Sequence, residues 1–127
     1  MTQGQSVEAA LNATETTETS LGNVTVPLGA KKIVGTYGIA TVLTTTAELA
    51  SGKFRFVQAA GPGGVHSFPL QVNQGPAGTL ASPGFSNEPR IIPVDIPTKE
   101  NDTIACYAVL DVAQTGTCRA RVGFIFE

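Results

Sequence analysis

The sequence predicts an all-β fold, an antiparallel sandwich of two sheets built from about eight short strands. Runs of alternating apolar and polar residues recur along the 127 residues, and 14 glycines and 8 prolines separate them. Apolar residues at the spacing of an amphipathic helix are nearly absent. The length corresponds to one domain. We expect a polar N-terminal arm over residues 1–20 and a single β-sandwich domain over residues 21–127.

The predicted arm contains the polar run Thr-Glu-Thr-Thr-Glu-Thr-Ser at residues 14–20. Alone, such a segment is disordered or weakly extended. Its threonines nevertheless favour β structure, so the arm can join a neighbour's sheet as an added strand. We therefore expect a chain without residues 1–18 to stay folded and to assemble poorly.

Four short strands follow from strict alternation. Their predicted inward faces are Val24, Val26 and Leu28; Phe54 and Phe56; Phe68, Leu70 and Val72; and Ile92, Val94 and Ile96. The last of these is predicted to be an edge strand, because prolines at 89, 93 and 97 cannot donate to a ladder.

Less regular segments connect these strands. Ile33 to Leu43 is apolar on both faces, which predicts a central strand covered on both sides. Thr44 to Gly52 fits a helical turn with a capping box, and Ala60 to Gly64 fits a turn. Asn73 to Pro89 is predicted to be a long loop. Seven strands are evident, and an eighth would come either from the arm or from residues 79–81.

The C-terminal segment predicts a β-hairpin. Ile104, Cys106, Ala108, Leu110 and Val112 share one face of its first strand, and Ala120, Val122, Phe124 and Phe126 share one face of its second. A loop over residues 115–117 would place Leu110 opposite Val122, Ala108 opposite Phe124 and Cys106 opposite Phe126. On the outer face the same register places Asp111 opposite Arg121.

The two cysteines are expected to be free. In the predicted hairpin they lie too far apart along the ladder for a disulfide. Cys106 is predicted to be a core residue and Cys118 to be half exposed near the turn. Two free thiols fit a reducing compartment.

The other candidate groups have structural explanations. His66 is the single histidine, and a metal site on a β-sandwich needs several. Asp95, Asp102 and Asp111 could together form a carboxylate site, but we assign structural roles to all three, with Asp102 in a turn and Asp111 in a cross-strand pair. Residues 61–64 lack the spacing of a phosphate loop, and the sequons at Asn12, Asn23 and Asn101 are attributed to chance. We predict no catalytic, cofactor-binding or metal-binding residue and no cofactor.

Composition constrains the partners. Only 14% of residues are charged. Either part of the surface binds another protein, or the surface is rich in threonine, serine and glycine and remains solvated. Residues 1–30 hold Glu8, Glu15 and Glu18 without a basic residue, and no basic block follows, so we expect no direct nucleic-acid binding. No stretch approaches the ~18 apolar residues of a membrane span, and no secretory signal is visible, so we expect cytosolic synthesis.

The polar arm, the ladder of short strands, the proline-rich connection over residues 73–97 and the terminal strand over residues 119–127 resemble viral single jelly-roll virion proteins. Segments such as residues 26–30 and 113–116 add to this resemblance to small phage and archaeal-virus proteins. It implies a jelly-roll-like sandwich that self-assembles into a shell as a capsid or decoration protein. The acidic arm departs from the basic arms that bind genomes.

Three functional classes follow from these observations. The first is a non-enzymatic virion subunit, made in the host cytoplasm, whose partners are copies of itself and other shell proteins; an extracellular filament joined by strand donation is a variant. The second is a β-sandwich binding module for a carbohydrate or protein ligand, although the chain has no tryptophan and only Tyr37 and Tyr107. The third is an enzyme, which the sequence favours least because no acid/base pair is evident.

Overall fold

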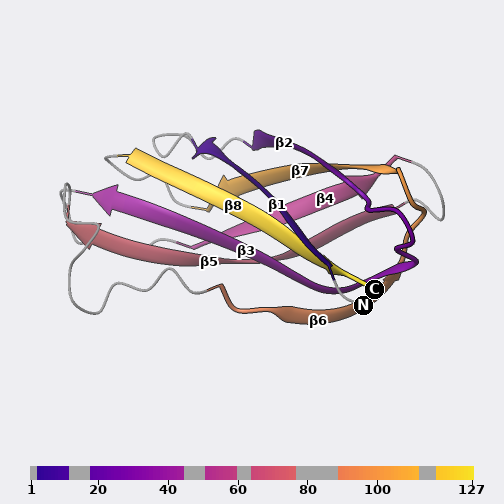
Figure 1. Cartoon of the computed structure of the whole chain (residues 1–127). Coiled ribbons are helices and arrows are strands. Elements are labelled where there is room, and N and C mark those ends of the chain that lie inside the picture. The colour runs from indigo at the N-terminus through magenta and orange to yellow at the C-terminus, as the bar shows by residue number, and fades with distance from the viewer. Residues whose placement is uncertain (1–2, 12–17, 45–50, 60–63, 77–88, 112–116) are drawn as a thin grey trace.

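The computed structural model describes residues 3–11, 18–44, 51–59, 64–76, 89–111 and 117–127. Within these ranges the chain forms eight strands and no helix (Figure 1). The strands are β1 (Gln3–Leu11), β2 (Thr19–Thr25), β3 (Lys32–Thr44), β4 (Gly52–Gln58), β5 (Gly64–Pro76), β6 (Ile92–Pro97), β7 (Thr103–Leu110) and β8 (Thr117–Phe126). The predicted all-β fold is confirmed.

The strands pair as a long antiparallel ribbon that is doubled on itself and rolled up. The first strand pairs with the last, and the pairing nests inward as β1 with β8, β2 with β7, β3 with β6 and β4 with β5. Lateral pairs of β3 with β8 and of β4 with β7 join these ribbons into two sheets. We call β1-β8-β3-β6 the β8 sheet and β2-β7-β4-β5 the β7 sheet. This connectivity is that of a jelly roll, as predicted.

Strand β5 belongs to both sheets. Its first half, residues 64–70, pairs with β4, and its second half, residues 71–76, runs parallel to the end of β3. The sheet is therefore mixed rather than wholly antiparallel. The strand also extends past the predicted loop start at Asn73, because β6 pairs only with the beginning of β3 and leaves the rest of that edge to β5. The optional short strand at residues 79–81 lies outside the described residues.

A cluster of phenylalanines fills the space between the sheets. Phe54 and Phe56 come from the β7 sheet, Phe124 and Phe126 come from the β8 sheet, and all four are fully buried. The rings of Phe56 and Phe124 meet edge to face across the two sheets, with centroids 4.8 Å apart and planes at 86°. This geometry is favourable for aromatic rings. The predicted inward faces of these strands are confirmed.

Strand β3 lies between β8 and β6 in the β8 sheet, and a glycine of this strand faces the phenylalanine cluster. The ring of Phe54 lies against Gly38 so closely that a Cβ at this position would overlap it. The hydroxyl of the fully buried Thr36 donates to the carbonyl of Gly123 on β8, at 3.0 Å, so it costs little to bury. The glycine inside this strand thus leaves room for a ring of the opposite sheet.

The predicted C-terminal hairpin is wrong. Strand β7 pairs with β2 and β4, whereas β8 pairs with β1 and β3, so the two strands lie in opposite sheets (Figure 1). Cys106 is therefore opposite Phe56 rather than Phe126, and Asp111 is not paired with Arg121. The predicted inward faces are nevertheless buried as far as the structure describes them. Alternation identifies which side chains enter the core, but it is the same for strands side by side and strands face to face.

The segment assigned to the arm contains strand. Residues 3–11 form β1, which pairs with β8 of the same chain, and β2 begins at Thr19. Residues 12–17 lie outside the described part of the chain. Of the helical turn predicted at residues 44–52, residues 45–50 also lie outside the described part, and the two end residues belong to β3 and β4.

The contact between Gly38 and Phe54 can be tested by adding one methyl group. We expect Gly38→Ala to lower the free energy of unfolding by about 1–3 kcal/mol, because the new Cβ must displace a packed ring. The control is Gly4→Ala on β1, where the nearest atom to a new Cβ is 4.0 Å away. Urea unfolding measures both variants. Equal stability of the two variants would show that the sheets approach less closely here.

Candidate assembly surfaces

His66 is held by packing against an aromatic ring and by a hydrogen bond. It lies on β5, with its ring centre 5.0 Å from that of Phe56 and the two ring planes tilted by 31°, and with its Nε2 3.2 Å from Oε1 of Gln58. The side-chain amide of Gln58 donates in turn to the carbonyl of Pro97, at 2.9 Å. This chain of contacts links β5, β4 and β6. Among the described residues, no group of three or more His, Cys, Asp or Glu side chains is arranged to hold a metal ion.

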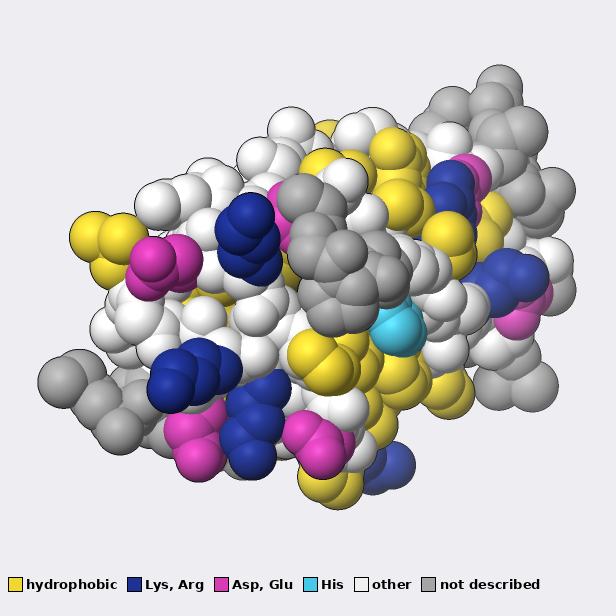
Figure 2. Space-filling model, turned by 90° about the vertical axis from the view of Figure 1, so that its right-hand side faces the viewer, with side chains coloured by type: hydrophobic (Ala, Val, Ile, Leu, Met, Phe, Trp, Pro, Cys, Tyr) yellow, Lys and Arg dark blue, Asp and Glu magenta, His cyan; other side chains and the backbone are white. Residues whose placement is uncertain are grey.

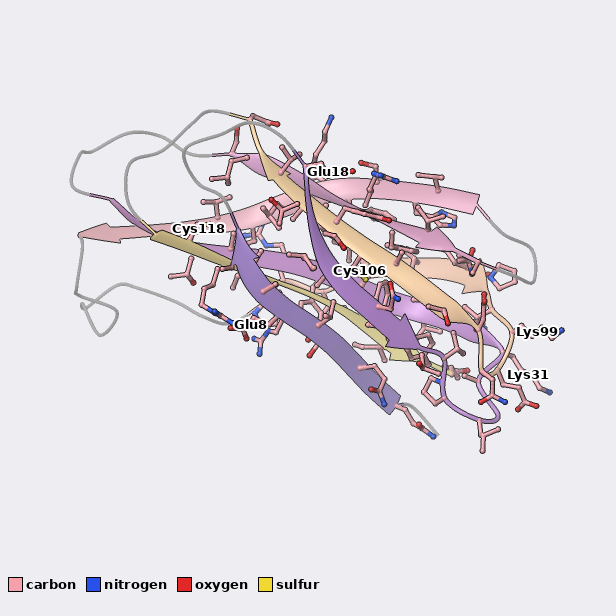
Figure 3. All side chains as sticks on the ribbon, turned by 90° about the horizontal axis from the view of Figure 1, so that it is seen from above. Glu8, Glu18, Lys31, Lys99, Cys106 and Cys118 are labelled. Atoms are coloured by element: carbon pink, nitrogen blue, oxygen red, sulfur yellow. The ribbon has the colours of Figure 1, made fainter. Side chains whose placement is uncertain are left out.

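The two cysteines are free thiols in different sheets, Cys106 on β7 and Cys118 on β8 (Figure 3). Both are buried, so the prediction that Cys118 is half exposed is wrong. Burial raises the pKa of Cys106 to about 12 and that of Cys118 to about 11. Their thiolates are therefore scarce near neutral pH, and both residues pack as small apolar side chains.

The three aspartates lie apart. Asp102 is buried in the turn before β7, where its Oδ1 accepts from the backbone N–H of Thr103 at 2.8 Å. Asp111 is exposed just after β7 and accepts from the hydroxyl of Ser51 at 3.2 Å. Asp95 is exposed on the edge strand β6. They form no common carboxylate site.

An arginine covers a tyrosine on the outer face of the β7 sheet. Arg55 makes two bonds to the carboxylate of Glu18, both 2.6 Å long, and its guanidinium lies 4.2 Å from the centre of the Tyr107 ring. The hydrogen bond from Arg55 is the main cause that lowers the pKa of Glu18. On the β8 sheet Arg121 lies 5.9 Å from the ring centre of Tyr37. Both tyrosine rings are thus engaged by cations.

The turn between β2 and β3 presents an apolar side chain. The N–H of Ala30 bonds to the carbonyl of Pro27 at 3.2 Å, and Gly29 between them has φ of 82°, as a type II turn requires. Leu28 stands at the tip, 71% exposed. The prediction that Leu28 lies on an inward strand face is wrong. The signal for its true position is the Pro-Leu-Gly order, which favours a turn.

This turn is rigidly held. The N–H of Gly29 donates to Oε2 of Glu100 at 2.8 Å, and Val26 exchanges backbone bonds with the turn that carries Asn101 and Asp102. Lys31 is bonded through its backbone to residues at the ends of β6 and β8. Figure 3 shows Lys31 and Lys99 projecting together from this end of the molecule.

The described strands leave four stretches of sheet edge. They are β1, β2, β6 and the first half of β5, each of which pairs on one side only. The predicted edge position of the proline-containing strand β6 is confirmed. The position of β1 at a sheet edge was not predicted. The sequence signal for this strand is the segment Gln3–Leu11, which is strand-like and has no proline or lysine.

The described part of the chain has no helix of the length and apolar character needed to cross a membrane.

Comparison with known proteins finds no matching family model and no matching curated protein. Among solved structures, a chain of the cyanophage Pam1 capsid asymmetric unit is similar over 98% of this chain and 83% of its own length. The TM-score is 0.49 and the sequence identity is 15%. A similarity this distant does not assign a function.

The burial of both thiols leads to a labelling prediction. At pH 8 we expect Cys118 in the native protein to react with a disulfide reagent on the order of 100-fold more slowly than in the unfolded chain, from its raised pKa alone. Cys106 should react more slowly still. Denatured, unreduced protein should give two thiols per chain. A rapid native reaction would contradict the burial, and fewer than two thiols would show a disulfide.

The bond between Glu18 and Arg55 leads to a pH prediction. The pKa of Glu18 is lower in the folded chain, so its contribution to stability is present above the unfolded pKa and is lost as the pH falls through the folded pKa. NMR titration should place the Glu18 midpoint below its ordinary value, and Arg55→Met should return it. The same midpoint in both proteins would mean that the pair does not form in solution.

Proposed function

We propose that this chain is a non-enzymatic structural subunit that self-assembles into a virion shell, as a capsid protein or as a decoration protein seated on a shell. The observation that carries the proposal is the exposure of two large apolar side chains at the end of the sandwich that holds the β2–β3 and β4–β5 connections. Leu28 is 71% exposed there, and Val65, near the start of β5, is 63% exposed. Large apolar side chains held out at one end are suited to burial against another protein.

The backbone around this end supports the proposal. Because the Leu28 turn is fixed by hydrogen bonds to neighbouring strands and to Glu100, its burial in an interface costs little conformational entropy. Figure 2 looks onto this end and shows apolar side chains interspersed with basic and acidic ones. Protein interfaces also contain both apolar and charged side chains.

The partners in this proposal are copies of the same chain, giving a homo-oligomer, and other shell proteins. The proposed location is the virion, after synthesis in the host cytoplasm. No direct contact with nucleic acid is proposed, because the chain has 8 basic and 10 acidic residues and its first 30 residues carry a net negative charge. The chain either forms the shell itself or decorates it, and both roles require the same property, which is assembly with other protein subunits.

A binding module for a carbohydrate or protein ligand is the alternative. Sugars stack on exposed aromatic rings, and this chain has only two tyrosines and no tryptophan. Arg55 lies over one tyrosine ring and Arg121 near the other, which leaves less aromatic surface for a sugar. These contacts favour the structural subunit over the carbohydrate module.

The proposal is tested by making the exposed end polar. We expect the wild-type chain to form oligomers or shells, and Leu28→Ser combined with Val65→Ser to shift it toward the monomer without loss of stability, because both side chains are exposed. Light scattering after size exclusion, with negative-stain images of the same fractions, measures the assemblies.

The matched control is Leu28→Met, which keeps an apolar side chain at the turn and should assemble normally. A wild-type chain that stays monomeric across salt and protein concentration would overturn the proposal. Normal assembly of the double variant would remove this end from the interface.

A further inference from the structure

Three of the four edge stretches carry features that prevent strand addition. Strand β2 has a register shift between Ser20 and Gly22, strand β6 contains Pro93 and Pro97, and the first half of β5 contains Pro69. Bulges and prolines are the usual means of protecting an edge. Strand β1 has none of them: its ladder with β8 is continuous over nine residues, and its sequence QGQSVEAAL has no proline and no lysine. Of the described edges, β1 is therefore the one left open.

The hydrogen bonds of β8 show which backbone groups of β1 are free. Lys32 and Glu127 exchange both backbone bonds, and the carbonyl of Gly123 also points toward β3, where it accepts from Thr36. In antiparallel sheets such pairs alternate, so the odd-numbered residues of β8 bond to β3 and the even-numbered ones bond to β1. In the β1–β8 register the even residues of β8 face the odd residues of β1. The N–H and C=O groups of Gly4, Ser6, Glu8 and Ala10 therefore point to the open edge.

The side chains of β1 also leave it available. Of its described side chains only Val7 and Ala9 are partly buried against the core, and the rest are exposed. Glu8 is anchored on the outer face by a 2.8 Å ion pair with Arg119 of β8. In Figure 3 the β1 ribbon lies at the margin of the molecule. A second strand can thus approach its edge.

We propose that β1 pairs antiparallel with β1 of a second copy about a two-fold axis through Val7, which joins two β8 sheets into one continuous sheet. In this register Gly4 faces Ala10 and Ser6 faces Glu8 of the second copy, so the free groups bond to each other and the whole strand is used. A register centred on Glu8 would place two Glu8 carboxylates directly opposite, and one centred on Ser6 would leave the end of β1 opposite residues before Gln3. The sequence of β1 is therefore self-complementary in one register.

This pairing rests on the proposed function, because it specifies one interface of the self-assembly, and its test separates the two. Ser6 is exposed and its N–H is not used by β8, so it can be changed with little effect on the subunit itself. Ser6→Pro removes a free donor from the open edge. Ser6→Glu places a carboxylate opposite Glu8 of the second copy, and Ser6→Lys places an ammonium there. The control Ser67→Glu makes the same charge change at an exposed serine of β5.

Sedimentation equilibrium of the full chain measures the dimer. We expect Ser6→Pro to abolish it, Ser6→Glu to raise its dissociation constant by about 2- to 30-fold and Ser6→Lys to lower it by a similar factor, since each dimer contains two such pairs. Ser67→Glu should leave it unchanged, and urea unfolding should show all variants folded. Assembly that persists unchanged in Ser6→Pro overturns this interface, including the case in which β1 exchanges onto the β8 of a neighbour, while the proposed function stands. A wild type that never leaves the monomer overturns both.

Discussion

The phenylalanine cluster between the two sheets, in which Phe56 meets Phe124 edge to face, is the packing contact on which the rest of the fold depends. The strand pairs are nested in the sequence, so the outermost pair, β1 with β8, closes the longest loop. Phe54 lies against Gly38 and Thr36 bonds to Gly123, so the sheets meet without a gap and without an unpaired hydroxyl at that position. Packing of this kind leaves little freedom for strands to slip.

The same nesting determines where the surfaces for assembly lie. Because successive strands run in opposite directions, the β2–β3 and β4–β5 connections emerge at one end, and each brings an exposed apolar side chain there, Leu28 and Val65. Because β1 is the outermost strand of the ribbon, it has one partner and one open side. One surface is apolar and presented by a rigid turn, whereas the other consists of backbone groups in register. The proposed subunit thus combines a hydrophobic contact with a directional one.

Much of the core was predictable from alternation, and the pairing was not. Phe54, Phe56, Phe124 and Phe126 are all buried as expected, since period-two patterns identify the inward face of a strand. The hairpin between β7 and β8 was wrong, because two inward faces look the same whether their strands are neighbours in a sheet or opposite each other across the core. Leu28 continued an alternating pattern past the end of its strand, where the turn residues on either side of it were the stronger signal.

The amide hydrogens of β1 test the central claim, that assembly uses the open edge of a strand already paired within its own chain. Hydrogen exchange followed by NMR on dilute monomer, and by quenched exchange on the assembled state, reports each amide separately. The account predicts that Gln5, Val7 and Ala9 are protected in both states, because they bond to β8, and that Ser6, Glu8 and Ala10 become protected only on assembly. Even-numbered amides that exchange equally fast in both states would contradict it, as would odd-numbered amides without protection in the monomer.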